Sequence, residues 1–199
     1  MKKAALILLV ITTFLLIKLK AQTTGTFSDA RDNKTYKTVT IGLQTWMAEN
    51  LNFITKKSWC YKNNANDCNV YGRLYNWKAA RKACPNGWHL PNKNEWQSLI
   101  VYLGGEDKAG GKMKESGSVH WKSPNTGATD ESGFNALPAG YWFYNDASFR
   151  NEGSSSVWWS ASKSVGAAWY CYMVSDKTIA DIKHDSKHDR YSVRCLKDY

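Results

Sequence analysis

Apolar and polar residues alternate along several short segments of this chain. The segment 35–42 carries Val39 and Ile41 on one face, with threonine at the positions on either side. Alternation over about four to eight residues is typical of a half-buried β-strand. Similar patterns predict further strands or extended segments, which in chain order are 44–52, 134–142, 156–162, 167–175, 177–182 and 190–196.

A helical period appears in two segments and predicts two helices. The first covers residues 73–84, with Trp77 and Ala80 on its apolar face. The second begins after Asn92, which suits an N-cap, and Glu95 stands at the third helical position as in a capping box. A pair of glycines ends it. Two early helices and a later antiparallel sheet predict an α+β domain.

The first residues have the pattern of an export signal. Two lysines precede the uncharged apolar run 4–17, which is shorter than the roughly 20 residues that a membrane-spanning helix needs. A small residue, Ala21, follows at the position expected for cleavage. We therefore expect residues 1–21 to be a signal peptide and residues 22–199 to form one secreted or cell-surface domain. An uncleaved anchor helix is the alternative.

The charge balance is basic but dispersed. The chain has 27 Lys and Arg residues against 17 Asp and Glu residues, a net charge of +10. Four of the lysines precede residue 22, and without them the net charge falls to +6. Nucleic-acid-binding domains concentrate their basic residues in a patch or stripe, so we expect no nucleic-acid partner. No second long apolar run follows the leader, so we expect no transmembrane segment after cleavage.

Five cysteines in an exported chain predict disulfides, although their spacing leaves many pairing schemes open. Cys60 and Cys68 flank a short polar loop, which a bridge between them would staple. A bridge between Cys84 and Cys195 would close a loop of about 110 residues and stabilise the fold by roughly 4–5 kcal/mol. These pairs leave Cys171, inside an alternating apolar segment, as a buried and unreactive thiol.

Several motifs, in order along nearly the whole chain after the leader, carry a family resemblance. They lie at residues 32–42, 44–52, 71–77, 84–91, 128–140, 158–162 and 192–198, and include Tyr71-Gly-Arg-Leu-Tyr-Asn-Trp and Cys84-Pro-Asn-Gly-Trp-His-Leu-Pro. Together they resemble the Fibrobacter succinogenes major paralogous domain family. The resemblance implies a secreted or cell-surface protein of Bacteroidetes-like or Fibrobacter-like bacteria, in a family whose biochemical role is poorly defined.

The order of a helix, a cysteine, a Gly-Trp-His-Leu-Pro segment, a second helix and a last-strand cysteine also resembles the C-type lectin fold. In that fold the first-helix cysteine pairs with the last-strand cysteine, which supports Cys84–Cys195. The resemblance therefore implies a C-type-lectin-like α+β fold, with two helices packed on a twisted antiparallel sheet, long loops and disulfide staples. The formylglycine-generating enzymes are relatives of that fold.

The resemblance to C-type lectins raises calcium as a possible ligand. C-type lectins hold calcium and sugar with a Glu-Pro-Asn or Gln-Pro-Asp loop, whereas 90–92 reads Leu-Pro-Asn here and precedes a helix. The segment 158–160 also lacks the expected carboxylate. Asn125, Asp130 and Glu131 gather oxygen ligands of the kind that calcium prefers. A capped polar turn is the simpler interpretation of this segment, and no other cofactor is expected.

Exposed aromatic residues are the expected ligand contacts. Tyr141, Trp142 and Trp158 offer flat faces that stack on sugars or anchor a protein partner. The formylglycine-generating enzymes bind copper with a Cys-x4-Cys pair, but the partner position of Cys171 is Asp176. We therefore expect a non-catalytic binding or adhesion module that recognises carbohydrate or protein through its late loops. The alternatives are an exported enzyme related to that group and a structural component of a surface assembly.

Overall fold

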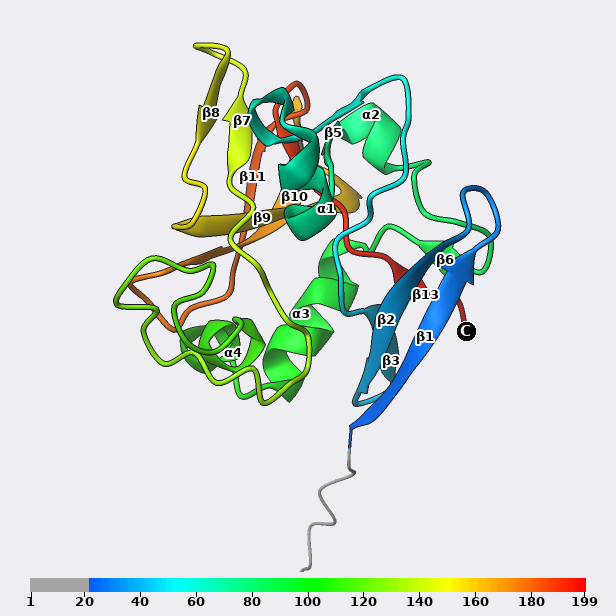
Figure 1. Ribbon diagram of the computed structural model, residues 1–199. Helices are drawn as coiled ribbons and strands as arrows, with labels where there is room; N and C mark the ends of the chain where they lie inside the picture. Colours follow the sequence, from blue (N-terminus) through cyan, green and yellow to red (C-terminus); the bar gives the residue numbers. More distant parts are fainter. Residues whose placement is uncertain (1–21) are drawn as a thin grey trace, which may run out of the picture.

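The computed structural model describes residues 22–199, which form two β-sheets and four α-helices (Figure 1). The signal peptide expected at residues 1–21 lies outside the described residues. Helices combined with largely antiparallel strands confirm the α+β class. Between residues 22 and 199, no helix is long and apolar enough to cross a membrane.

The first sheet joins the beginning and the end of the described chain. Its strands, in spatial order, are β1 (Thr23–Asp29), β2 (Lys34–Ile41), β3 (Gln44–Met47), β13 (Leu196–Lys197) and β6 (Trp88–His89). The expected strand at 35–42 is confirmed as β2, in which Val39 and Ile41 are buried. Leu196 pairs with Trp46 on one side and His89 on the other. The last strand therefore lies inside the sheet, between β3 and β6.

The second sheet carries most of the late chain. Its main path runs β11 (Asp181–Ser186), β10 (Ala167–Val174), β9 (Ser155–Lys163), β12 (Arg190–Ser192), β5 (Leu74–Asn76) and β4 (Ser58–Trp59). In addition β7 (Tyr141–Phe143) pairs with β12, and β8 (Ser148–Arg150) pairs with β7. The strands expected at 156–162 and 167–175 are confirmed as β9 and β10. Residues 155–160 of β9 are all buried, because other elements cover both faces of this strand.

Of the helices, α3 follows the sequence pattern most closely. The helices are α1 (Ala65–Tyr71), α2 (Trp77–Ala80), α3 (Lys93–Tyr102) and α4 (Glu106–Met113), and one 3-10 turn, η1 (Tyr61–Asn63), precedes α1. The capping box is formed: the Glu95 backbone donates to Asn92 Oδ1 at 3.0 Å, and the Asn92 backbone donates to Glu95 Oε2 at 2.7 Å. Because α3 packs against β9, β10 and β11, Trp96 and Leu99 are fully buried.

The helix expected at 73–84 is wrong over most of its length. Leu74–Asn76 is strand β5, and α2 covers only Trp77–Ala80. The backbone of β5 pairs with β12 and β4, so tertiary pairing overrides the helical spacing of the apolar residues. The side chain of Asn76 caps α2 by accepting from the Ala79 backbone at 3.0 Å, which places the helix start at Trp77.

Other element predictions also need correction. Within 134–142 only β7 is a strand, preceded by isolated bridges at Ala136 and Gly140, and β11 begins at Asp181 rather than at residue 177. The sequence pattern missed β1, α1 and α4. Helix α4 contains Gly110, a poor helix former. Packing requires that glycine, since a Cβ there would overlap the carbonyl oxygen of Ile179.

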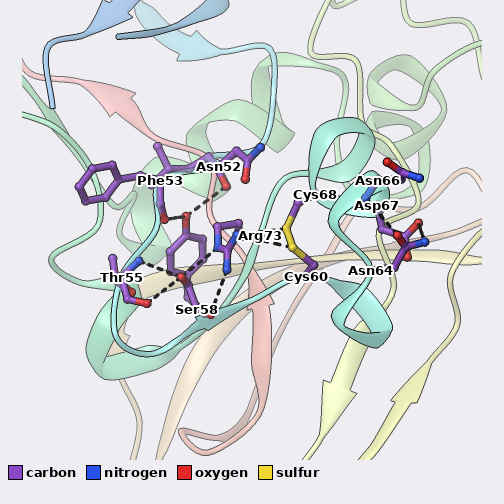
Figure 2. The surroundings of a disulfide bond; sticks show 12 residues. Asn52, Phe53, Thr55, Ser58, Cys60, Asn64, Asn66, Asp67, Cys68 and Arg73 are labelled. Carbon is purple, nitrogen blue, oxygen red and sulfur yellow. Dashed lines mark hydrogen bonds between the residues drawn. A yellow bond between two sulfur atoms is a disulfide. The ribbon is translucent and has the colours of Figure 1, made fainter. Parts of the chain in front are cut away.

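Disulfides connect elements that are distant or poorly packed. The structure contains the two pairs expected from the sequence, Cys60–Cys68 and Cys84–Cys195. The first joins the N-cap of η1 to α1, and Arg73 lies between this disulfide and Ser58, whose Oγ accepts from Arg73 Nε at 3.0 Å (Figure 2). The second ties the segment after α2 to the last strand region. The remaining cysteine, Cys171, is fully buried in β10.

Candidate ligand-binding site

Trp158 belongs to the core, so its expected role in ligand stacking is wrong. Its side chain is fully buried, and Nε1 donates to Asn50 Oδ1 at 2.7 Å. The rings of Trp96 and Phe134 lie with their centroids 6.1 and 5.7 Å from that of Trp158. The prediction failed because β9 is covered on both faces, which the alternation pattern of its sequence does not reveal.

Asn50 links Trp158 to a second buried polar residue. Asn50 Oδ1 also accepts from Nε and an Nη of Arg194, at 3.1 and 2.8 Å. The remaining Arg194 donors reach backbone carbonyls, including that of Phe134 at 2.6 Å. Burial lowers the pKa of Arg194 to about 9. Both residues line a hollow of about 310 Å³, but their polar groups already satisfy one another, so this hollow is a weaker ligand site.

Two of the three candidate calcium ligands, Asp130 and Glu131, have partners for their side-chain oxygens, whereas the buried Asn125 Oδ1 forms no hydrogen bond within residues 22–199. The amide of Asn125 donates to two backbone carbonyls, at 2.9 and 2.6 Å. Asp130 Oδ1 accepts from the Asn135 backbone at 2.8 Å, and Glu131 forms an ion pair with Lys112 at 2.9 Å. Among residues 22–199, no group of three or more His, Cys, Asp or Glu side chains is placed to hold a metal ion. These contacts favour the capped polar turn.

Tyr141, in contrast, lines a pocket between the β7–β8 hairpin and β10. The pocket has a volume of about 180 Å³. Five aromatic side chains line it: Tyr141, Phe143, Tyr170, Tyr172 and Tyr191. In Figure 1 the hairpin rises at the upper left above β9, and other residues that line the pocket come from β9, β10, β11 and β12.

Strand alternation aims these rings at the pocket. In β7, Tyr141 and Phe143 line the pocket, whereas Trp142 between them contacts Arg190 instead. In β10, Tyr170 and Tyr172 line it, whereas Cys171 between them is fully buried in the core. The period of two in these strands therefore produces two opposed faces of tyrosine and phenylalanine.

Tyr191 is the most buried of the five rings and packs against two of them. Its centroid lies 5.9 Å from that of Tyr141 and 5.0 Å from that of Tyr170, both edge-on. Its hydroxyl donates to Asp189 Oδ2 at 3.0 Å, and Asp189 Oδ1 accepts from the Tyr144 backbone at 2.8 Å. Burial raises the pKa of Asp189. This buried carboxyl thus ties the hairpin to β12.

Polar groups stand at the rim of the pocket. Asn151 and Asp185 are exposed residues that line it. Neither the Tyr170 nor the Tyr172 hydroxyl forms a hydrogen bond within residues 22–199, and burial raises the pKa of both. These hydroxyls are therefore neutral near pH 7 and available as donors and acceptors. The pocket combines flat apolar faces with an amide, a carboxylate and hydroxyl groups.

Trp142 is half-buried, but it lies outside the tyrosine-lined pocket. It stacks on the guanidinium of Arg190, whose central carbon lies 3.8 Å from the ring centroid. Trp59 covers Arg190 from the other side at 3.6 Å. Sequence reasoning missed Trp59 and Arg190. Strand β4, which contains Trp59, has only two residues, too few to show an alternation of apolar and polar positions.

Cys171 has no neighbouring thiol with which to form a catalytic pair. The other four cysteines are joined in disulfides, and Cys171 itself is fully buried. Burial raises the pKa of its thiol far above the usual range. A thiol in this state is a poor nucleophile and a poor metal ligand.

Three of the aromatic residues that line the pocket were not singled out from the sequence: Tyr170, Tyr172 and Tyr191. A signal was present, because tyrosines flank the buried Cys171 in strict alternation, as expected for a strand with one face in the core. The pattern does not say whether the second face is open or covered. Only the position of the β7–β8 hairpin settles that point.

Comparison with known proteins gives one match. A family model described as the Fibrobacter succinogenes major domain matches residues 39–197, which includes every strand and helix of the site. Comparisons with curated proteins and with solved structures find no match.

Proposed function

The chain belongs to the Fibrobacter succinogenes major domain family, and we propose that it is a non-catalytic module that binds a carbohydrate ring in the tyrosine-lined pocket. The proposal includes export through the leader and a place outside the cell or at its surface. Two disulfides support it, since disulfides persist in oxidising compartments. The fold in this proposal is C-type-lectin-like, as the bridge between Cys84 and Cys195 suggests.

The pocket itself is the observation that carries the proposal. At about 180 Å³ it is smaller than the roughly 300–1,000 Å³ usual for drug-sized ligands. A single sugar ring suits this size better than a larger planar cofactor. An extended saccharide would leave its other rings along the hairpin.

The chemistry of the lining also fits a sugar. The C–H face of a pyranose packs against aromatic rings, which keep their polar tips free for hydrogen bonds. Here Tyr170 and Tyr172 supply ring faces and free hydroxyls, and Asp185 and Asn151 supply a carboxylate and an amide at the rim. Carboxylates and amides pair well with sugar hydroxyls because they accept hydrogen bonds strongly.

The alternatives gain less support. An enzyme of the formylglycine-generating type would need a second thiol or a metal beside Cys171, and the other four cysteines are disulfide-bonded. A structural role in a surface assembly would show as repeated self-association of the protein in solution. Neither alternative explains why free tyrosine hydroxyls line an open pocket.

A glycan-array screen of the oxidised protein, with and without a calcium chelator, tests the proposal. We expect binding that survives the chelator and is lost in Tyr172→Ala. The control is Tyr102→Ala, which removes an exposed tyrosine from α3. Binding that the chelator abolishes would redirect attention to Asp130 and Glu131. Binding that Tyr172→Ala leaves intact would contradict the pocket assignment, as would the absence of binding to any glycan.

A further inference from the structure

A guanidinium clamped between two indole rings lies on the other side of strand β7. Arg190 of β12 pairs in register with Trp142 of β7 on one side and Asn76 of β5 on the other. Trp59 comes from β4, the strand beyond β5. The Arg190 central carbon lies 3.6 Å from the Trp59 centroid and 3.8 Å from the Trp142 centroid. Both flat faces of the guanidinium are therefore covered, and only its edge remains for hydrogen bonds.

The edge of this guanidinium has no partner in the described protein. No hydrogen bond or ion pair from the Arg190 side chain forms within residues 22–199. Partial burial lowers the pKa of Arg190. A partly desolvated cation without a partner costs stability, and a bound anion would offset that cost.

Two other arginines that stack on aromatic rings have carboxylate partners. Arg31 lies 3.8 Å from the Phe53 centroid and donates to the Asp29 carboxylate at 2.6 Å. Arg150 lies 4.3 Å from the Phe143 centroid and pairs with Asp146. Stacking and a carboxylate partner therefore occur together at Arg31 and Arg150, but not at Arg190 or at Arg81, which lies over Trp77.

Two further cations contact Trp77, the first residue of α2. Trp77, which follows β5 directly, is contacted by Arg81 at 4.9 Å and by Lys187 at 5.2 Å. Neither of these side chains forms an ion pair within residues 22–199. Asp189 is next to Arg190 in sequence but does not pair with it. The Asp189 carboxyl is buried and accepts a hydrogen bond from the Tyr191 hydroxyl on the opposite face.

We propose that Arg190, held between Trp59 and Trp142, binds the oxyanion of an acidic saccharide, either a uronic acid carboxylate or a sulfate ester. A guanidinium edge matches carboxylate and sulfate geometry with two parallel hydrogen bonds. Both indoles are half-buried, so they offer aromatic surface to the sugar that carries the anion. The site is independent of the tyrosine-lined pocket, since Trp142 and Tyr141 point to opposite faces of β7.

Nuclear magnetic resonance of the oxidised protein tests this site directly. The side-chain N–H signals of Arg190, Trp59 and Trp142 are followed while an oligogalacturonate or a sulfated galactose oligomer is added. Neutral galactose oligomers and sodium chloride at equal ionic strength are the comparison additions. The two acidic saccharides distinguish a carboxylate ligand from a sulfate ligand. We expect at least one of them to shift these signals saturably, while the comparison additions do not.

Two matched variants make the result specific. Arg190→Lys keeps the charge but loses the planar edge, and we expect it to weaken binding about tenfold or more. Arg31→Lys alters a stacked arginine that already has a carboxylate partner, and we expect unchanged binding. The proposal is overturned if neither acidic saccharide shifts the signals, if sodium chloride or the neutral oligomer shifts them equally, or if Arg190→Lys binds like the wild type. Failure here would leave the tyrosine-lined pocket untouched.

Discussion

The Tyr191 hydroxyl donates a hydrogen bond to Oδ2 of Asp189 at 3.0 Å beneath the tyrosine-lined pocket. Asp189 uses its other oxygen to hold the backbone of Tyr144. One buried carboxyl therefore fixes both the strand below the pocket and the hairpin above it. The pocket owes its shape to this link, and a ligand would find its aromatic walls already in place.

Removing that hydroxyl tests the link. In Tyr191→Phe, Oδ2 of the buried Asp189 loses its partner, and we expect the free energy of unfolding to fall by about 1–3 kcal/mol. Urea denaturation measures the change. Tyr102→Phe is the control, because Tyr102 is exposed. If the two variants were equally stable, the hydrogen bond would not hold the hairpin.

Asp130 should make stability depend on pH below neutrality. Burial raises its pKa to about 6 in the folded state, against about 3.9 in an unfolded chain. Between about pH 4 and 6 the folded state binds the proton and the unfolded state does not, so this residue makes stability fall as pH rises. Asp130→Asn keeps an oxygen acceptor for the Asn135 backbone and should remove that slope. Urea midpoints from pH 4 to 7 provide the test, and an unchanged slope would contradict it.

His89 should make stability depend on pH in a higher pH range than Asp130 does. Partial burial disfavours its charge, but hydrogen bonds to Asp198 at 2.6 Å and Glu95 at 3.0 Å outweigh burial and raise its pKa. The stabilisation is fully present below about pH 6.5, the unfolded value, and is lost as pH rises through the folded pKa. We expect His89→Gln to reduce the fall in stability above that pH. Titration of the His89 ring by NMR gives the pKa, and a value below 6.5 would reverse the sign.

The two disulfides should differ in their contribution. Cys84–Cys195 spans 111 residues and Cys60–Cys68 spans 8. Chain entropy predicts that removing the long bridge costs about 4–5 kcal/mol and the short one about 2–3 kcal/mol. Paired Cys→Ala variants, compared by urea denaturation, measure both values. A larger loss from the short bridge would show that it acts through local packing around Arg73 rather than through chain entropy.

Local signals in the sequence were sufficient for part of the fold. The Asn92 and Glu95 capping box marked the start of α3, and alternation around Val39 and Ile41 marked β2. These features depend on residues close together in the chain. The apolar spacing at 73–84 was ambiguous, and only pairing with β12 makes Leu74–Asn76 a strand.

The site was harder to predict because exposure is a property of the assembled fold. Tyr141 and Trp142 were identified as exposed aromatic residues, but the sequence could not show which neighbours each ring would have. Trp158 carries the same aromatic signal and is fully buried. Arg190 could not be identified from the sequence for a related reason. The two indoles that stack on it, Trp59 and Trp142, come from strands that are distant in sequence.

Isothermal titration of the strongest glycan-array ligand into the wild type, Tyr172→Ala and Tyr102→Ala is the most direct test of the central claim. The account predicts saturable binding to the wild type and to Tyr102→Ala, with affinity at least about tenfold lower, or more than 1.4 kcal/mol weaker, for Tyr172→Ala. Equal affinity for all three proteins would contradict the assignment of the tyrosine-lined pocket as the carbohydrate site.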